Sequence, residues 1–143
     1  GPPRHRKDGA RFPRVDTGNP SPGRTFAVAD AAMNDPVRPA LYDVHHAVLP
    51  VKATGAKWIT ADIVGPVGEP GDYLARNRAI PAVDADDLLA VMTAGAYGAV
   101  QSGTYNTRAL VPEVLVKDDQ YAVVRPRIEV DELIAMDRQA PWL

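Results

Sequence analysis

The chain has 143 residues and a formal net charge of −2, and 45% of its residues are hydrophobic and 24% charged. This composition is typical of one globular domain, since domains commonly have about 100–200 residues. The absence of cysteine excludes disulfides, thiolate metal sites and cysteine nucleophiles. No apolar run approaches the roughly 20 residues of a transmembrane helix. No secretory signal is visible either, so we expect a cytoplasmic protein that does not bind membranes.

The charge is distributed unevenly along the chain. Residues 1–24 carry six Arg and Lys against two Asp, with five Pro and four Gly, whereas the remainder carries ten basic and sixteen acidic side chains. We expect residues 1–23 to be a basic, disordered or unrelated segment and residues 24–143 to form the folded domain. Basic tails can bind nucleic acid, but no aromatic stacking platform accompanies this charge. We therefore do not expect a nucleic-acid partner.

The first expected elements are a short strand over 25–30 and a helical turn over 34–42. Asn34 or Asp35 is the expected N-cap, with Pro36 in the first helical position. Residues four apart share one face of a helix, so Arg38 and Tyr42 would lie on the same side of this turn.

The rest of the chain is predicted to be mostly short strands. Runs rich in β-branched and other apolar residues predict strands at 46–51, 57–67 and 88–93. Strands over 111–116 and 121–125 would form a hairpin, and 130–136 a short amphipathic helix. Many short strands separated by turns indicate a mainly β fold, a barrel or sandwich with short helices.

Candidate binding residues occur where loops meet these elements. Glu69 and Asp72 lie in a turn after an apolar strand, Tyr97 follows another strand, and Arg38 and Tyr42 lie on the early helical turn. A guanidinium pairs with a carboxylate through two hydrogen bonds, and a carboxylate binds an ammonium group. These groups are therefore suited to a zwitterionic or dicarboxylate ligand.

The histidines do not predict a metal site. His45 and His46 are adjacent, and neighbouring residues of a strand point to opposite faces, so they make a poor chelating pair. With His5 in the basic segment, we expect no bound metal.

Several motifs in the second part of the chain resemble those of one enzyme family. Residues 30–42 read D-A-A-M-N-D-P-V-R-P-A-L-Y, and residues 65–72 read G-P-V-G-E-P-G-D. Residues 94–98 read A-G-A-Y-G, and further similarity continues through 105–108 and 112–116. In this order the motifs resemble D-A-G-M-N-D-x-x-R-P-A-L-Y, G-P-V-C-E-S-G-D and A-G-A-Y-G of the bacterial diaminopimelate decarboxylases.

The resemblance implies a fold-type III decarboxylase that depends on pyridoxal 5'-phosphate. In that family an N-terminal (β/α)8 barrel holds the Schiff-base lysine, and a C-terminal β domain caps an active site shared by two subunits of a homodimer. This chain resembles the C-terminal domain only, without the barrel. By motif, Arg38 and Tyr42 would contact the substrate, Glu69 its distal ammonium, and Tyr97 both substrate and cofactor.

One departure from the motifs concerns a catalytic group. Gly68 stands where the family has a cysteine thought to donate a proton, and Pro70 replaces a Ser or Thr. The resemblance predicts a part of the enzyme that converts meso-2,6-diaminopimelate to L-lysine and CO2 in lysine biosynthesis, inactive alone because the cofactor lysine is missing. The alternative is a non-catalytic relic or binding module. Either would pair with a barrel domain or a second decarboxylase subunit.

Overall fold

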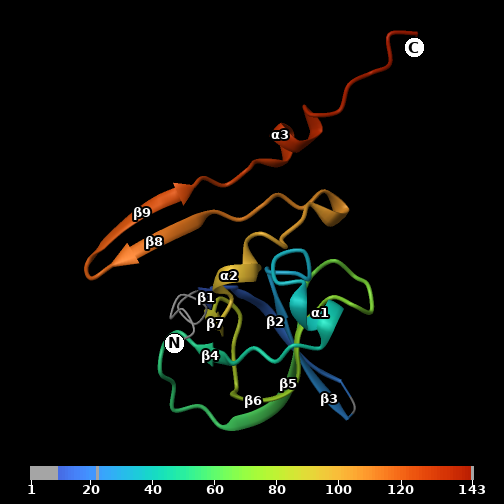
Figure 1. The fold of residues 1–143 in the computed structure, drawn as a ribbon. Helices are drawn as coiled ribbons and strands as arrows, with labels where there is room; N and C mark the ends of the chain where they lie inside the picture. The colour runs from blue at the N-terminus through green and yellow to red at the C-terminus, as the bar shows by residue number, and fades with distance from the viewer. Residues whose placement is uncertain (1–9, 22, 143) are drawn as a thin grey trace.

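The computed structural model describes residues 10–21 and 23–142, which form a β-rich body and a projecting arm (Figure 1). A four-stranded sheet in the body has the order β2-β3-β5-β6, and a three-stranded sheet has the order β1-β7-β4. The larger sheet comprises β2 (Val15–Ser21), β3 (Arg24–Ala29), β5 (Trp58–Val64) and β6 (Tyr73–Pro81). The smaller comprises β1 (Ala10–Arg11), β7 (Leu89–Met92) and β4 (Val48–Pro50).

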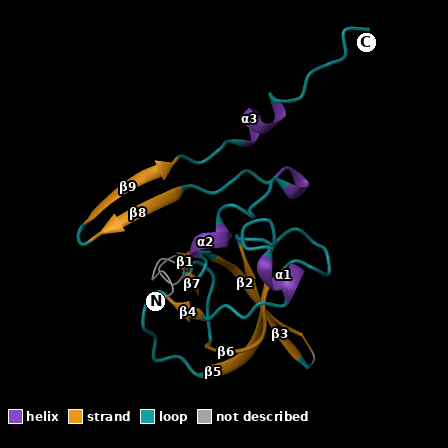
Figure 2. Cartoon of the chain, viewed as in Figure 1, coloured by secondary structure: helices purple, strands orange, loops and turns teal. Residues whose placement is uncertain are grey.

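Short helices and a hairpin complete the described chain (Figure 2). The helices are α1 (Arg38–Tyr42), α2 (Gly95–Gly98) and α3 (Val130–Ile134), with a 3-10 turn at Tyr105–Thr107. The hairpin consists of β8 (Glu113–Lys117) and β9 (Gln120–Arg125). The prediction of a mainly β fold with short helices is confirmed, although the sheets do not close into a barrel. The longest of the described helices have five residues, too few to cross a membrane.

One hydrophobic core joins the two sheets of the body. β3 and β5 pair in parallel, whereas the other pairs of both sheets are antiparallel. The core residues come from both sheets and are mostly small or β-branched: Val15, Ala27, Ala29, Val48, Ala61, Ile63, Leu74, Ala75, Ile80, Leu89 and Val91. Burial of such side chains is the main favourable contribution to folding.

The expected separation of residues 1–23 from the fold is wrong for residues 10–21. β1 pairs with β7, and β2 pairs with β3 from Val15↔Ala29 to Ser21↔Arg24. An edge strand is held by backbone hydrogen bonds and needs few apolar side chains, which explains why its composition suggested disorder. Residues 1–9 and 22 lie outside the described part of the chain.

The helical turn begins later than expected, at Arg38 with Val37 as N-cap, so neither proposed cap is used. The Asn34 amide donates to the carbonyl of Gly103 at 3.1 Å. The Asp35 carboxylate accepts from a backbone N–H three residues earlier, at 3.0 Å. Both candidate caps therefore form hydrogen bonds that order the loop before the helix.

Strand β6 was missed because its centre is polar. Arg76, Asn77 and Arg78 interrupt its apolar pattern, and Asn77 has a φ of 50°. The buried Asp62 carboxylate of β5 accepts the Asn77 N–H at 2.7 Å. A contact from the neighbouring strand thus stabilises a conformation that the local sequence does not favour.

The arm extends from the body and comprises the hairpin, α3 and the segment that follows (Figure 1). Val114 and Val116 lie opposite Val123 and Tyr121 on one face of the hairpin, and Leu115 lies on the other. All five side chains are exposed. A two-stranded ribbon is marginal by itself in water, so this arm is expected to need a covering surface.

The close packing at Gly65 can be tested by substitution. A Cβ atom there would lie 2.4 Å from Asp72 Oδ1 and 2.7 Å from the Ala32 Cα. We expect Gly65→Ala to lower the free energy of unfolding by about 1–3 kcal/mol, as overpacking does elsewhere. Urea denaturation measures the change. Gly55→Ala is the matched control, because a Cβ at Gly55 has no neighbour within 4 Å; equal effects of the two substitutions would contradict the prediction.

Candidate functional site

The turn that carries Glu69 is fastened to the loop over residues 30–35 by a buried aspartate. Asp72, 4% exposed, accepts the Met33 N–H at 2.8 Å through Oδ1 and the Val67 N–H at 2.6 Å through Oδ2. Hydrogen bonds to a carboxylate are stronger than those between neutral groups. Asp72 is expected from the sequence to be a possible ligand contact. In the structure its carboxylate instead holds the turn with Glu69 against the loop over 30–35.

The same loop holds the segment that leads to Tyr105. Asn34 and Gly103 exchange two hydrogen bonds, of 3.1 Å from the side-chain amide and 2.9 Å between backbone groups. The Tyr105 hydroxyl donates to Glu69 Oε2 at 2.9 Å, and the Gly71 N–H donates to Oε1 at 3.2 Å. Both oxygens of Glu69 are thus oriented by groups of this chain.

Arg38 and Tyr97 are brought together from α1 and α2. The Arg38 guanidinium carbon lies 5.0 Å from the centroid of the Tyr97 ring, a cation–π distance. Arg38 Nε is buried without a hydrogen-bond partner, and within residues 10–21 and 23–142 Arg38 forms no ion pair. Tyr97 is 42% exposed. A guanidinium held on a ring and not neutralised by a carboxylate is suited to bind an anionic group.

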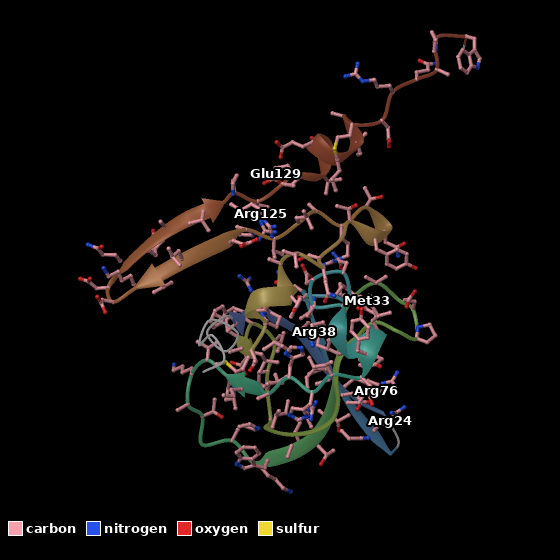
Figure 3. The ribbon with its side chains drawn as sticks, viewed as in Figure 1. Arg24, Met33, Arg38, Arg76, Arg125 and Glu129 are labelled. Carbon is pink, nitrogen blue, oxygen red and sulfur yellow. The ribbon has the colours of Figure 1, made fainter. Side chains whose placement is uncertain are left out.

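The remaining predicted residues are less closely connected. Tyr42 shares α1 with Arg38 but is exposed. A cavity of about 450 Å³ is lined by Gly68, Glu69 and Tyr73 among others, but not by Arg38, Tyr42 or Tyr97. The Tyr73 hydroxyl donates to the carbonyl of Pro39 in α1 at 3.1 Å, which links this cavity to the helix. Figure 3 shows Met33 and Arg38 in the region of α1.

Tyr105 is the residue that the sequence interpretation missed. It belongs to the motif at 105–108, but nothing in the sequence indicated that it contacts Glu69, which is 36 residues away. The hydrogen bond to Glu69 raises the pKa of Tyr105, with smaller effects of the carboxylate charge and of burial. In this pair the neutral phenol of Tyr105 donates a hydrogen bond to Oε2 of Glu69.

Gly68 has the conformation that glycine favours. Its φ is +80°, and a Cβ there would have no neighbour within 4 Å. A larger side chain would therefore find room but would have to adopt a left-handed backbone, at a cost of about 1–2 kcal/mol.

The histidines have separate environments. His45 is exposed and its Nδ1 contacts the Arg78 guanidinium, whereas His46 is buried with Nδ1 2.9 Å from the Met92 carbonyl oxygen. In the part of the chain that the structure describes, no three His, Cys, Asp or Glu residues group together as metal ligands do.

Comparison with known proteins identifies the family. Residues 6–95 match the C-terminal sheet domain of pyridoxal-dependent decarboxylases, so the chain belongs to this family. This match also places residues before 24 within the domain. The chain is 51% identical over 118 residues to the diaminopimelate decarboxylase of Zymomonas mobilis, covering 82% of this chain and 28% of that protein.

Another relative and a solved structure agree. The diaminopimelate decarboxylase of Aquifex aeolicus is 42% identical over 109 residues, 76% of this chain and 26% of that protein. The crystal structure of diaminopimelate decarboxylase from M. jannaschii in co-complex with L-lysine has a TM-score of 0.91 and 30% identity, covering 96% of this chain and 32% of that one. The chain therefore spans about a quarter to a third of the proteins it matches.

The Tyr105–Glu69 contact predicts a specific pH dependence. The hydrogen bond favours the neutral phenol, so the folded pKa of Tyr105 lies above its unfolded value of about 10. The stabilisation is complete below that unfolded value and is lost as the pH rises through the folded pKa. In an absorbance titration of phenolate, we expect Glu69→Ala to lower the pKa of Tyr105, and Glu69→Gln to lower it less. Tyr105→Phe identifies the transition; a titration curve unchanged by Glu69→Ala would show that the contact is absent in solution.

Proposed function

We propose that this chain is the substrate-binding cap of a diaminopimelate decarboxylase, which converts meso-2,6-diaminopimelate to L-lysine and CO2. The observation that carries the proposal is the Arg38–Tyr97 pair, whose guanidinium has no carboxylate partner in the described chain. It occurs in a chain half of whose aligned residues are identical to those of a diaminopimelate decarboxylase.

The charges of the proposed substrate match these groups. Diaminopimelate carries two carboxylates and two ammonium groups. Arg38 pairs with a carboxylate, Glu69 binds the distal ammonium, and Tyr42 and Tyr97 border the substrate. Because Tyr105 and Gly71 already orient Glu69, less entropy is lost when the ligand binds.

In our proposal, pyridoxal 5'-phosphate lies at the edge of this site and is anchored by another domain. Lys52, Lys57 and Lys117, the lysines of the described chain, are all exposed, and Lys117 lies on the arm. A cofactor held by another domain would meet the chain at Tyr97, beside Arg38. When bound, this cofactor supplies the electron sink for loss of CO2, while the residues of this chain bind and orient the substrate.

The arm supports a partner domain in the same proposal. Its apolar side chains are exposed on both faces of the hairpin, a surface that soluble monomers rarely leave uncovered. The covering surface in our proposal is the cofactor-binding N-terminal domain of the decarboxylase. A homodimer in the cytoplasm is part of the same proposal.

A non-catalytic module that pairs with a complete decarboxylase subunit is the second candidate. It is favoured by Gly68, because glycine offers no proton at the position where the related motif has cysteine. Positioned general acids typically contribute about 10²–10⁴-fold to a rate.

A chimeric enzyme separates these candidates. In it, this chain replaces the C-terminal region of the Zymomonas mobilis decarboxylase that it matches. We expect the chimera to bind pyridoxal 5'-phosphate, seen by visible absorbance, and to release lysine and CO2 from meso-diaminopimelate. Arg38→Met should lower kcat/KM by roughly 10- to 150-fold, because a hydrogen bond to a charged group contributes about 1.5–3 kcal/mol.

The matched control for this substitution is Arg14→Met. Arg14 forms an exposed ion pair with Asp86, so its replacement should leave kcat/KM unchanged. A folded chimera that binds the cofactor but releases no CO2 would exclude the first candidate and favour the non-catalytic module.

Restoring a thiol at position 68 tests the role of the missing acid. In the chimera, Gly68→Cys should raise kcat, by up to about 10²-fold, because a thiol supplies the proton that glycine lacks. The same substitution should reduce stability by about 1–2 kcal/mol, because φ at this position is +80°. Gly68→Ala is the control, as it shares the backbone strain without the proton. If alanine and cysteine give the same kcat, position 68 does not supply the proton.

A further inference from the structure

Arg11, at the end of β1, is a charged side chain enclosed by the body and outside the set of proposed ligand contacts. Its side chain is 12% exposed. Nη2 donates to the carbonyl oxygen of Gly98 and to the Oγ of Ser102, both at 2.9 Å. Burial lowers the pKa of Arg11, and the charge of Asp35 partly offsets this effect. Enclosing a guanidinium is costly unless its donors are used, so these contacts determine how the surrounding segments pack.

The contact with Gly98 acts on α2, the helix that carries Tyr97. A helix of four residues has too few internal hydrogen bonds to be stable alone, and its last carbonyls need other donors. Arg11 supplies such a donor to the carbonyl of Gly98, the residue directly after Tyr97. A Cβ at Gly98 would lie 3.9 Å from Arg11 Nε, which is an ordinary van der Waals distance. Ser102 Oγ also lies 2.8 Å from the Gly98 carbonyl oxygen, which completes a small cluster at this helix end.

The other side of the Arg11 guanidinium faces the segment that leads to Arg38. Nη1 lies 3.9 Å from Oδ1 of Asp35, a residue 2% exposed. Asp35 Oδ2 accepts the Ala32 N–H, whereas Oδ1 has no hydrogen-bond partner. Asp35 precedes Arg38 by three residues. One guanidinium therefore contacts both chain segments whose side chains form the cation–π pair.

We propose that Arg11 is a positioning residue: its buried guanidinium bridges Asp35 and Gly98 and thereby sets the distance between Arg38 and Tyr97. It acts through the two backbone segments that carry the pair, by its contacts with Gly98 and Asp35. This inference rests on the proposed function only for its kinetic consequence, because the geometry of the pair can be observed in the chain itself.

The first measurement is the NMR signal of the Tyr97 ring in the tyrosine-labelled chain, assigned with Tyr97→Phe. Arg38→Met defines the shift that follows loss of the stacked guanidinium. We expect Arg11→Met to move the Tyr97 signal toward that value, and Arg11→Lys to move it less, since an ammonium keeps the charge but not the planar arrangement of donors. Arg14→Met, on the same segment but exposed, should leave it unmoved.

A second variant keeps the test decisive if Arg11→Met does not fold. Ser102→Ala removes one acceptor of Arg11, together with the hydrogen bonds from Ser102 to the carbonyls of Gly98 and Ala99, and leaves the Arg11 charge in place. A smaller shift in the same direction is therefore expected. A Tyr97 signal identical to that of the parent in every folded variant of Arg11 and Ser102 would overturn the proposal.

The chimera gives the kinetic readout. A misplaced binding group can cost up to about 10²-fold in rate. Arg11→Lys should therefore lower kcat/KM by up to this factor, mainly by raising KM. The control Arg14→Met should leave the melting temperature unchanged. An inactive chimera whose Tyr97 signal still responds to Arg11 would reject the proposed function and retain the positioning role. An active chimera whose Tyr97 signal does not respond to Arg11 would retain the proposed function and reject the positioning role.

Discussion

The arrangement of the site depends on the buried carboxylate of Asp72. It accepts N–H groups from two separate stretches of chain, at Met33 and Val67, and so joins the turn before β6 to the loop after β3. Gly65 permits this approach, because any Cβ there would overlap the carboxylate. A carboxylate taken out of water is stable only when its oxygens are used. The need to satisfy Asp72 therefore dictates where the turn with Glu69 lies.

The loop over residues 30–35 extends the same principle to the other segments of the site. Asn34 binds Gly103, and Asp35 faces Arg11. Asp30 contributes as well: its carboxylate accepts the backbone N–H of Arg14 at 2.7 Å. Two carboxylates and one amide within these six residues thus connect strands and helices that are distant in sequence. Such networks favour one arrangement of the chain, because leaving a member unsatisfied is costly.

The sequence predicted the mainly β class, the hairpin and most strand positions because these depend on local apolar patterns. It missed β6, whose central Asn77 adopts a left-handed backbone that Asp62 of the neighbouring strand β5 stabilises by accepting its N–H. It also assigned Asn34 and Asp35 to a helix cap, where their side chains have suitable chemistry but are used in contacts 69 and 3 residues away. Local propensity cannot reveal partners that only the folded chain brings near.

For the site, the residue types were predictable and their partners were not. Arg38, Glu69 and Tyr97 were selected from their positions at the ends of elements and from motifs. Tyr105, which orients Glu69, was not selected, and Arg11 was placed in a segment expected to be disordered. Groups that contact a ligand leave a recognisable pattern, whereas groups that orient them are set by packing.

The arm and the candidate ligand site are separate parts of the chain. At the base of the arm, Arg125 of β9 pairs with Glu113 of β8 at 2.8 Å and donates to the carbonyl of Val111 at 3.3 Å, so the two strands are joined where the hairpin begins (Figure 3). Beyond this point its exposed residues are mostly apolar. An apolar ribbon whose strands are joined in this way can contact a second domain without contributing polar groups to it. The polar groups that we propose bind the ligand are concentrated instead around the loop over 30–35, so the proposed docking and recognition surfaces lie in separate parts of the sequence.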